Sequence, residues 1–158
     1  MEVGFDIDGV LTEDGYVENS EEVLKAKRSS IRVPSYAYII SARPKKLQNE
    51  TDHWLDENGI KYKVMVLMND YDFREMMRMD TQRGQERLQG EFKAKWCENL
   101  SLDLFVEDRE EVRKKLIDVC GDRTLILSPE HYEKGNWDKI LIDEVQEANS
   151  QGLKGGMY

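Results

Sequence analysis

The chain of 158 residues is long enough for one domain whose core needs no disulfide or metal ion for its stability. Its net charge of −9 argues against strong non-specific binding to a nucleic-acid backbone, and its two cysteines form neither a CxxC pair nor a disulfide framework. No apolar run approaches the ~18 residues of a membrane-spanning helix, and the acidic start leads into a strand without a signal peptide, so we expect a cytoplasmic protein.

Short apolar runs rich in β-branched and aromatic residues predict five β-strands along the chain. The runs lie at residues 3–7, 36–40, 62–68, 102–106 and 124–127. Helical patterns separate them, with apolar residues at intervals of three or four. The clearest stripe consists of Leu88, Phe92, Trp96 and Leu100. This alternation predicts an α/β fold in which a parallel sheet carries helices on both faces.

Two stretches depart from the alternation. Residues 69–92 begin with the polar, Met-rich segment NDYDFREMMRMDTQRGQ, which is long for a connection between elements. It is either a flexible insertion or a loop that faces the substrate, and we expect it to border the functional site. After a core of residues 1–128, apolar residues at helical spacing predict a closing helix within 129–150, followed by a frayed tail at 151–158.

Polar side chains follow four of the predicted strands at the point where each strand ends. They are Asp6 and Asp8 after the first strand, Ser41 and Arg43 after the second, Asn69 and Asp70 after the third, and Glu107, Asp108 and Arg109 after the fourth. In an open parallel sheet, ligands bind outside the carboxyl ends of the strands. The sequence therefore predicts that these groups converge on one site.

The acidic residues at these strand ends predict a magnesium site. Asp6 and Asp8 are two residues apart, so they point to the same side of an extended chain, and Glu107 or Asp108 adds a third carboxylate. Carboxylates this close repel one another unless a cation or a proton lies between them. Hard oxygen ligands without His or Cys favour Mg²⁺. The competing interpretation is that Asp-x-Asp-Gly forms only a turn.

The same residues predict phosphoryl transfer. Asp6, held at the end of a strand, suits a nucleophile that forms an aspartyl-phosphate, and Asp8 on the following loop suits general acid–base catalysis. The phosphoryl oxygens need donors and cations around them, which Ser41 and either Lys93 or Lys95 would supply. The alternative roles are a helix cap for Ser41 and a solvated helix surface for either lysine.

The motifs FDIDGVL, IISARP, a lysine before an amphipathic helix, and FVEDRE occur in the order of the haloacid dehalogenase (HAD) phosphohydrolase superfamily, which the chain resembles over residues 1–128. The resemblance implies a Rossmann-like three-layer α/β/α sheet, Mg²⁺ and an aspartyl-phosphate intermediate. It makes Asp6 the nucleophile and Asp8 the general acid and base. We prefer Lys93 over Lys95 as the motif lysine, because Lys93 directly follows Phe92 where the helix is expected to begin.

By motif, the remaining roles fall on residues at the same strand ends. The implied metal ligands are Asp6, Asp8, Glu107 and Asp108, and the groups that would bind phosphate or substrate are Ser41, Ala42, Arg43 and Arg109. Two positions depart from the common HAD pattern. Val10 stands where Thr is most frequent, and the acidic pair is Glu107–Asp108 rather than two aspartates, which leaves open which of the two holds the metal.

The first two motifs leave no room for a large cap domain between them, so we expect an open site that favours large substrates. Within the HAD superfamily, SARP at 41–44, LMND at 67–70 and EDREEVRKKL at 107–116 are similar to the 3′-phosphatase domain of polynucleotide kinase-phosphatases. This similarity implies a phosphorylated substrate such as a nucleic-acid 3′ end or a nucleotide. The net charge opposes a nucleic acid unless a basic rim forms at the site from Arg74, Arg78, Arg83 and Arg87.

Two other functions fit the same residues. One is a non-catalytic HAD-fold module that binds a metal or a partner. The other is a phosphatase for small metabolites whose open site is covered by a second subunit. Against the first, a relative without activity usually lacks Asp6, Asp8 or the lysine, and all are present. The sequence leaves the oligomeric state open between a monomer and a small homo-oligomer.

Overall fold

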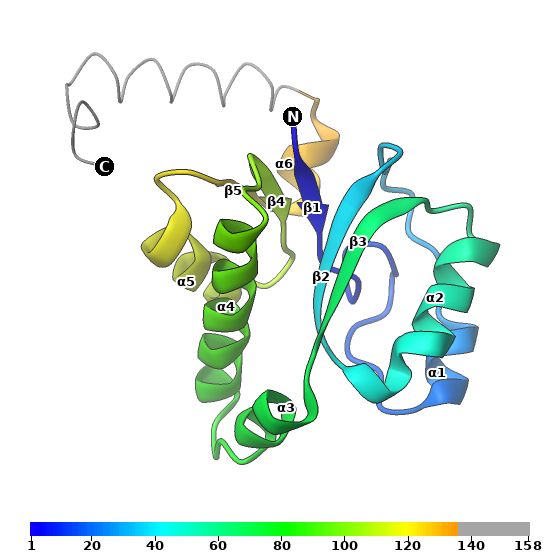
Figure 1. The fold of residues 1–158 in the computed structure, drawn as a ribbon, viewed down its shortest axis with the longest axis horizontal. Coiled ribbons are helices and arrows are strands. Elements are labelled where there is room, and N and C mark those ends of the chain that lie inside the picture. Colours follow the sequence, from blue (N-terminus) through cyan, green and yellow to red (C-terminus); the bar gives the residue numbers. More distant parts are fainter. Residues whose placement is uncertain (136–158) are drawn as a thin grey trace.

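The computed structural model of the chain describes residues 1–135, which form a five-stranded parallel β-sheet with helices on both faces (Figure 1). The strands are β1 (Val3–Phe5), β2 (Ala37–Pro44), β3 (Tyr62–Met68), β4 (Leu104–Val106) and β5 (Leu125–Leu127). The helices are α1 (Ser20–Lys25), η1 (Lys45–Leu47), α2 (Gln48–Glu57), α3 (Asp70–Met77), α4 (Gln82–Asn99), α5 (Glu110–Cys120) and α6 (Pro129–Glu133). The predicted Rossmann-like α/β fold is therefore confirmed, and no large cap domain lies within residues 1–135.

The strands lie in the order β3-β2-β1-β4-β5, so the chain winds outward from β1 in both directions. β1 pairs with β2 on one side and with β4 on the other. The connections after β1 and β4 therefore lead to opposite faces of the sheet, which opens a crevice at the carboxyl ends of these two strands. This crevice is where a ligand site is expected.

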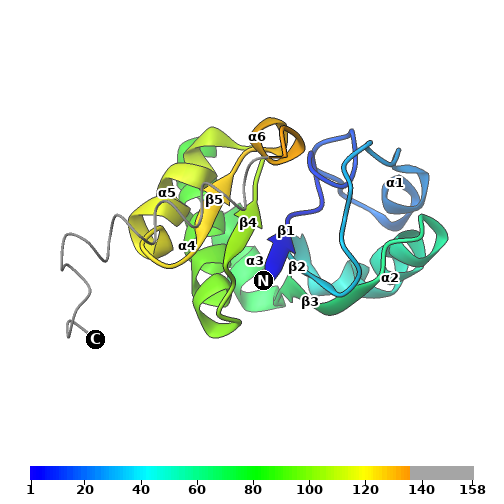
Figure 2. The ribbon, with the colours of Figure 1, turned by 90° about the horizontal axis from the view of Figure 1, so that it is seen from above.

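Two apolar clusters join the helices to the sheet. On one face, Phe5 of β1 packs in a cluster with Trp54 of α2 and Tyr132 of α6. On the other face, Phe105 of β4 packs in a cluster with Ala94 of α4 and Leu116 of α5. Figure 2 shows α1, α2 and α6 on one side of the sheet and α4 and α5 on the other. Burial on both faces explains why β1, β4 and β5 are continuous apolar runs.

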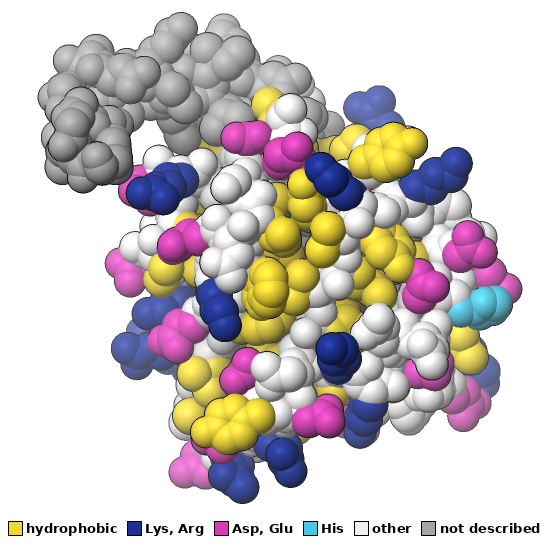
Figure 3. Space-filling model, viewed as in Figure 1, with side chains coloured by type: hydrophobic (Ala, Val, Ile, Leu, Met, Phe, Trp, Pro, Cys, Tyr) yellow, Lys and Arg dark blue, Asp and Glu magenta, His cyan; other side chains and the backbone are white. Residues whose placement is uncertain are grey.

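The edge strand β3 is less completely covered. Its residues Val64 and Val66 are only partly buried, and so are Phe92 and Trp96 of the neighbouring helix α4. Figure 3 shows a hydrophobic surface in the centre of this face of the molecule. Burial of the sheet is thus complete in the middle and partial at this edge.

Residues 69–92 are largely helical, so the prediction that a helix begins just before Lys93 is wrong. Asn69 and Thr81 each accept a hydrogen bond from a backbone amide and cap α3 and α4, respectively. Such caps satisfy donors that the first turn of a helix leaves free. As a result α4 begins at Gln82, and Lys93 lies well inside its 18 residues.

The end of the described chain carries one short helix. Within the range 129–150 of the predicted closing helix, α6 begins after its cap Ser128 and ends before Gly135, whose φ is 77°. The remainder of that predicted helix and the predicted tail at 151–158 lie outside the described residues. Among residues 1–135, no helix is long and apolar enough to cross a membrane.

Candidate active site

Polar groups from the ends of β1, β2 and β4 meet at the crevice. The amide of Asp6 donates to the carbonyl of Val106 at 3.1 Å, which ties the end of β1 to β4. One pocket lies there, lined by Asp6, Asp8, Tyr16, Ala42, Arg43, Met76, Gln89, Lys93 and Arg109. The residues that follow β3 do not join the site as predicted. Asn69 and Asp70 do not line this pocket, because they form the cap and first turn of α3.

The loop after β1 is a compact turn that requires glycine at position 9. The carbonyl of Ile7 accepts hydrogen bonds from the amides of residues 10–12, so the chain turns back at once. Gly9 has a φ of 80°, and a Cβ atom on it would lie 2.1 Å from Oδ2 of Asp108. Glycine therefore lets the loops after β1 and β4 approach each other. This approach brings Asp108 beside the Asp-x-Asp-Gly turn.

Lys93 is buried between two carboxylates. Its Nζ lies 2.9 Å from Oδ2 of Asp6 and 2.5 Å from Oε1 of Glu107. Burial alone would lower the pKa of this ammonium, but the two carboxylates outweigh burial and hold the pKa above its usual value. Lys95 is exposed instead, with its Nζ 5.9 Å from the centroid of the Trp96 ring. Of the two candidate lysines, Lys93 is the one that contacts the acidic groups.

Asp6 is held in a fixed orientation. Its Oδ1 accepts a hydrogen bond from the amide of Ile7 at 2.7 Å, while Oδ2 faces Lys93. Burial raises the pKa of Asp6 to about 7; the charge of Lys93 opposes this change and that of Glu107 adds to it. A further cation near this carboxyl group would favour its ionised form.

Three carboxyl groups form a cluster that fits a hard divalent cation. Asp6, Glu107 and Asp108 can each place one oxygen within 4.8 Å of the others. Glu107 uses Oε1 for Lys93 and Oε2 for the amide of Asp108, whereas Oδ1 of Asp108 is buried without a hydrogen-bond partner. One ammonium group cannot balance three carboxylates. Oxygen ligands with excess negative charge suit Mg²⁺, and Asp108 offers the oxygen that has no other partner.

The carboxylate of Asp8 lies outside this cluster, and its role as a metal ligand stays a prediction. Nε of Arg43 lies 3.2 Å from both Asp8 oxygens, and Nη2 lies 2.8 Å from Oδ1. Nη1 of Arg43 donates to Oγ1 of Thr51 in α2 at 3.1 Å. Burial raises the pKa of Asp8, and the hydrogen bonds and charge of Arg43 oppose that rise. The guanidinium group therefore fixes the orientation of the Asp8 carboxylate.

Only some of the predicted phosphate-binding residues line the pocket. Ala42 and Arg43 line the pocket, but Arg43 is buried and committed to Asp8 and Thr51. Ser41 is fully buried beside the pocket, and its Oγ accepts a hydrogen bond from the amide of Arg43 at 3.1 Å. Arg109 lines the pocket as the N-cap residue of α5 and is partly exposed. Among the predicted cations, Arg109 therefore has the side chain most available to a ligand.

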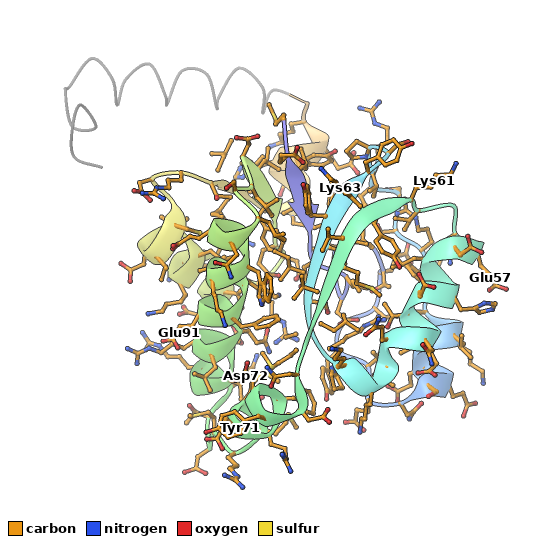
Figure 4. All side chains as sticks on the ribbon, viewed as in Figure 1. Glu57, Lys61, Lys63, Tyr71, Asp72 and Glu91 are labelled. Atoms are coloured by element: carbon orange, nitrogen blue, oxygen red, sulfur yellow. The ribbon has the colours of Figure 1, made fainter. Side chains whose placement is uncertain are left out.

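Three pocket residues were not predicted from the sequence, namely Tyr16, Met76 and Gln89. Met76 comes from α3 and Gln89 from α4, and α3 lies at the end of the molecule where β3 ends (Figure 4). The pocket is small, with a volume of about 20 Å³. Met76 and Gln89 both belong to the stretch 69–92. That the site is open to large substrates stays a prediction. The sequence contains a weak signal for Gln89, because it lies one helical turn before Lys93 and therefore on the same side of a helix.

The four arginines of the predicted basic rim do not line this pocket. Arg74 lies on α3, and Arg78 follows that helix and pairs with Glu75 at 2.9 Å. Arg83 and Arg87 lie on α4 and line a separate groove between α4 and α5. The rim as predicted is therefore split between two places.

Comparison with known proteins shows a similar fold and no close sequence relative. No protein family and no curated protein matches the sequence of this chain. A solved chain from the Pnkp1/Rnl/Hen1 RNA repair complex has a similar fold, with a TM-score of 0.57 and 11% sequence identity. The match covers 80% of this chain and 42% of the solved chain, so this chain spans less than half of that protein's length. At this identity, the similarity establishes a shared fold.

Proposed function

We propose that this protein is a Mg²⁺-dependent phosphomonoester hydrolase that acts through an aspartyl-phosphate on Asp6. The observation that carries the proposal is the arrangement around Asp6. Its carboxyl group faces the buried ammonium of Lys93, and the buried Oδ1 of Asp108 nearby has no partner. The order and the grouping of these residues agree with the HAD resemblance in the sequence.

In the first step, a carboxylate oxygen of Asp6 attacks the phosphorus atom, and the bond from phosphorus to the leaving oxygen breaks. Asp8 donates a proton to that oxygen, which its raised pKa favours. Water then attacks the phosphorus of the aspartyl-phosphate. Asp8 accepts a proton from this water, and the products are inorganic phosphate and the original Asp6 carboxylate.

The other residues of the site position these groups. Arg43 fixes the orientation of Asp8, and Glu107 holds Lys93 against Asp6. Arg109 and the ammonium of Lys93 offer positive charge to the phosphoryl oxygens. Asp6 and Asp108 would hold Mg²⁺, which when bound adds positive charge that balances the phosphoryl group and the buried carboxylates.

We further propose that the substrate is a phosphate at the 3′ end of a nucleic acid. A terminal phosphate can present its phosphorus atom to Asp6 at the pocket while the base and sugar stay outside. The resemblance of the sequence to the 3′-phosphatase domain and the similar fold in an RNA repair complex point in the same direction.

Phosphate release with Mg²⁺ tests the proposal, with wild type beside Asp6→Asn. The substrates are an aryl phosphate, nucleoside 3′- and 5′-monophosphates and an oligonucleotide with a 3′-phosphate. We expect Asp6→Asn to lose at least about 10³-fold in kcat, because the nucleophile is absent. Asp122→Asn, an exposed change of the same chemistry, should keep wild-type activity.

Activity of Asp6→Asn near the wild-type level would overturn the assignment of the nucleophile. A folded wild-type protein that binds Mg²⁺ but releases no phosphate from any substrate would favour a non-catalytic binding module. Activity confined to small phosphate esters would favour a metabolite phosphatase, and light scattering would then show whether a second subunit is present to cover the site.

A further inference from the structure

Beside the catalytic pocket, α4 and α5 enclose a groove of about 670 Å³. It is lined by Thr81, Arg83, Gly84, Arg87, Glu111, Lys114, Lys115 and Asp118. The two helices touch at Gly90, where a Cβ atom would lie 2.5 Å from Cβ of Lys115. The missing side chain at Gly90 lets the helices pack closely there, and the groove lies along the surface beside this contact.

The groove is positively charged in a chain that is negative overall. Four cationic and two acidic side chains line it, whereas the whole chain carries a charge of −9. Arg87 is exposed and has no ion pair among the described residues. A local excess of positive charge of this kind attracts polyanions even when the net charge does not.

The other cations of the groove hold ion pairs, which are exposed for Arg83 and Lys114 and partly buried for Lys115. Arg83 lies 3.9 Å from Glu111, and Lys114 lies 3.3 Å from Glu111. Lys115 lies 3.6 Å from Glu91 of α4, whose side chain points away from the sheet (Figure 4). Exposed pairs contribute little to stability. Arg83 and Lys114 can therefore turn to a phosphate without a large cost to the fold.

The catalytic pocket and the groove both have a lining residue at the start of α5. Arg109 lines the pocket as the cap of α5, and Glu111 of the groove follows two residues later. On α4, Arg87 of the groove and Gln89 of the pocket are two residues apart, so they face different sides of the helix. Arg109 thus provides a positive charge between the pocket and the groove.

A second surface hollow, beside Tyr16, has the opposite charge. Its volume is about 620 Å³, and its charged lining residues are Asp14, Glu21, Glu22 and Lys25. A polyanion that leaves the pocket is repelled on this side and attracted on the side of α4 and α5. The difference in charge gives the two directions different affinities for a nucleic-acid strand.

We propose that the α4–α5 groove binds the phosphodiester backbone of a single-stranded nucleic acid whose terminal phosphate occupies the catalytic pocket. This proposal rests on the proposed function, since it assumes that the pocket receives a phosphate. It adds a binding site remote from the reacting atoms. The groove would make oligonucleotides better substrates than mononucleotides and make their binding sensitive to salt.

The test compares wild type with Arg87→Glu/Lys114→Glu on 3′-phosphorylated single strands of about ten nucleotides, in DNA and RNA form, and on an aryl phosphate. We expect KM for the oligonucleotides to rise at least tenfold in the variant, because phosphate contacts become repulsive. The aryl phosphate does not reach the groove, so its kcat/KM should change less than twofold. Lys25→Glu in the acidic hollow is the matched control and should behave as wild type on both substrates.

Salt dependence provides a second readout. For single strands, log kcat/KM falls with log salt by about 0.7 per phosphate contact, so loss of two contacts should reduce the slope by about 1.4. The variant Arg87→Ala/Lys114→Ala should also reduce the slope. It replaces the double Glu variant in this test if that variant does not fold. Equal effects on oligonucleotide and aryl phosphate, or unchanged KM and salt slope, would overturn the proposal.

Binding measurements separate this proposal from the proposed function. Fluorescence anisotropy with a labelled single strand that lacks the 3′-phosphate requires no catalysis. Affinity that falls at least tenfold in the double variant supports the groove even if no phosphate is released from any substrate. Affinity that is equal in wild type and variant overturns it even if Asp6 proves to be the nucleophile. A preference for RNA over DNA strands in the same assay would identify the natural source of the backbone.

Discussion

Arg43 holds Asp8 with two nitrogens of its guanidinium group, at 3.2 Å and 2.8 Å from Oδ1, while its third nitrogen donates to Thr51 of α2. The arginine comes from the end of β2 and the aspartate from the loop after β1. A helix on one face of the sheet therefore determines, through Arg43, where the proposed proton donor stands. This link connects the fold directly to the proposed chemistry.

Replacement of Arg43 by Lys should lower kcat about 10- to 100-fold, because an ammonium cannot reproduce the planar two-point contact with Asp8. Arg32→Lys, an exposed change of the same kind, should leave kcat unchanged. Steady-state rates of phosphate release measure both. Wild-type activity in Arg43→Lys would show that the orientation of Asp8 does not depend on this contact.

The pH profile of Arg43→Met tests the electrostatic part of the same contact. Burial raises the pKa of Asp8, and Arg43 opposes it. Without the guanidinium group, the pKa should rise further, so the alkaline limb of the kcat profile should move to higher pH if protonated Asp8 is the acid. If the alkaline limb stays at the same pH in Arg43→Met, a group other than Asp8 determines it.

Replacement of Lys93 by Met should destabilise the fold by about 3 kcal/mol, because it leaves the buried carboxylates of Asp6 and Glu107 without their cation. Lys95→Met removes a lysine from the exposed side of the same helix and should change stability by less than about 0.5 kcal/mol. Urea unfolding measures both. Additional replacement of Glu107 by Leu should recover part of the lost stability. A double-mutant cycle would give the coupling energy between Lys93 and Glu107.

Magnesium should stabilise the protein more at high pH than at low pH. Without metal, the folded state holds a proton on Asp6 up to a pKa of about 7, whereas its ordinary value is 3.8. The folded state thus binds more protons between these values, and stability from this group falls as pH rises through that window. Mg²⁺ favours the ionised form, so we expect a larger gain in Tm at about pH 8 than at about pH 5.5.

The control for the magnesium effect is Asp108→Asn. It retains the shape of the side chain but removes the charge of the carboxyl group whose Oδ1 has no hydrogen-bond partner. The gain in Tm on addition of Mg²⁺ should shrink in this variant at both pH values. An equal gain in wild type and variant would exclude Asp108 as a ligand.

Replacement of Gly9 by Ala should cost about 1–3 kcal/mol of stability and weaken the response to Mg²⁺. The positive φ of Gly9 strains any other residue, and the new Cβ would meet Oδ2 of Asp108 at 2.1 Å. Gly15→Ala is the matched control, since no atom lies within 4 Å of the Cβ position there. Thermal unfolding with and without Mg²⁺ checks both effects, and similar results for the two variants would contradict the close approach at Gly9.

The fold was predictable because its signals are local. Each strand is a short apolar run, and all residues of β1, β4 and β5 are buried, so the pattern does not depend on distant residues. The prediction that a helix begins only just before Lys93 is wrong for a local reason as well. The caps Asn69 and Thr81 are ordinary helix starts, but the polar composition between them is also typical of a loop.

The sequence by itself determined that acidic and basic groups follow successive parallel strands, and chain connectivity alone places such groups at one edge of a sheet. Only the tertiary structure decided which group meets which. Arg43 is 35 residues from Asp8, and Lys93 is 14 residues from Glu107. The pairing of Glu107 with Lys93, the unpartnered oxygen of Asp108 and the narrow pocket all depend on how α4 packs against the sheet. The side-chain pattern of a single segment does not contain that packing, because it arises from contacts between segments far apart in the chain.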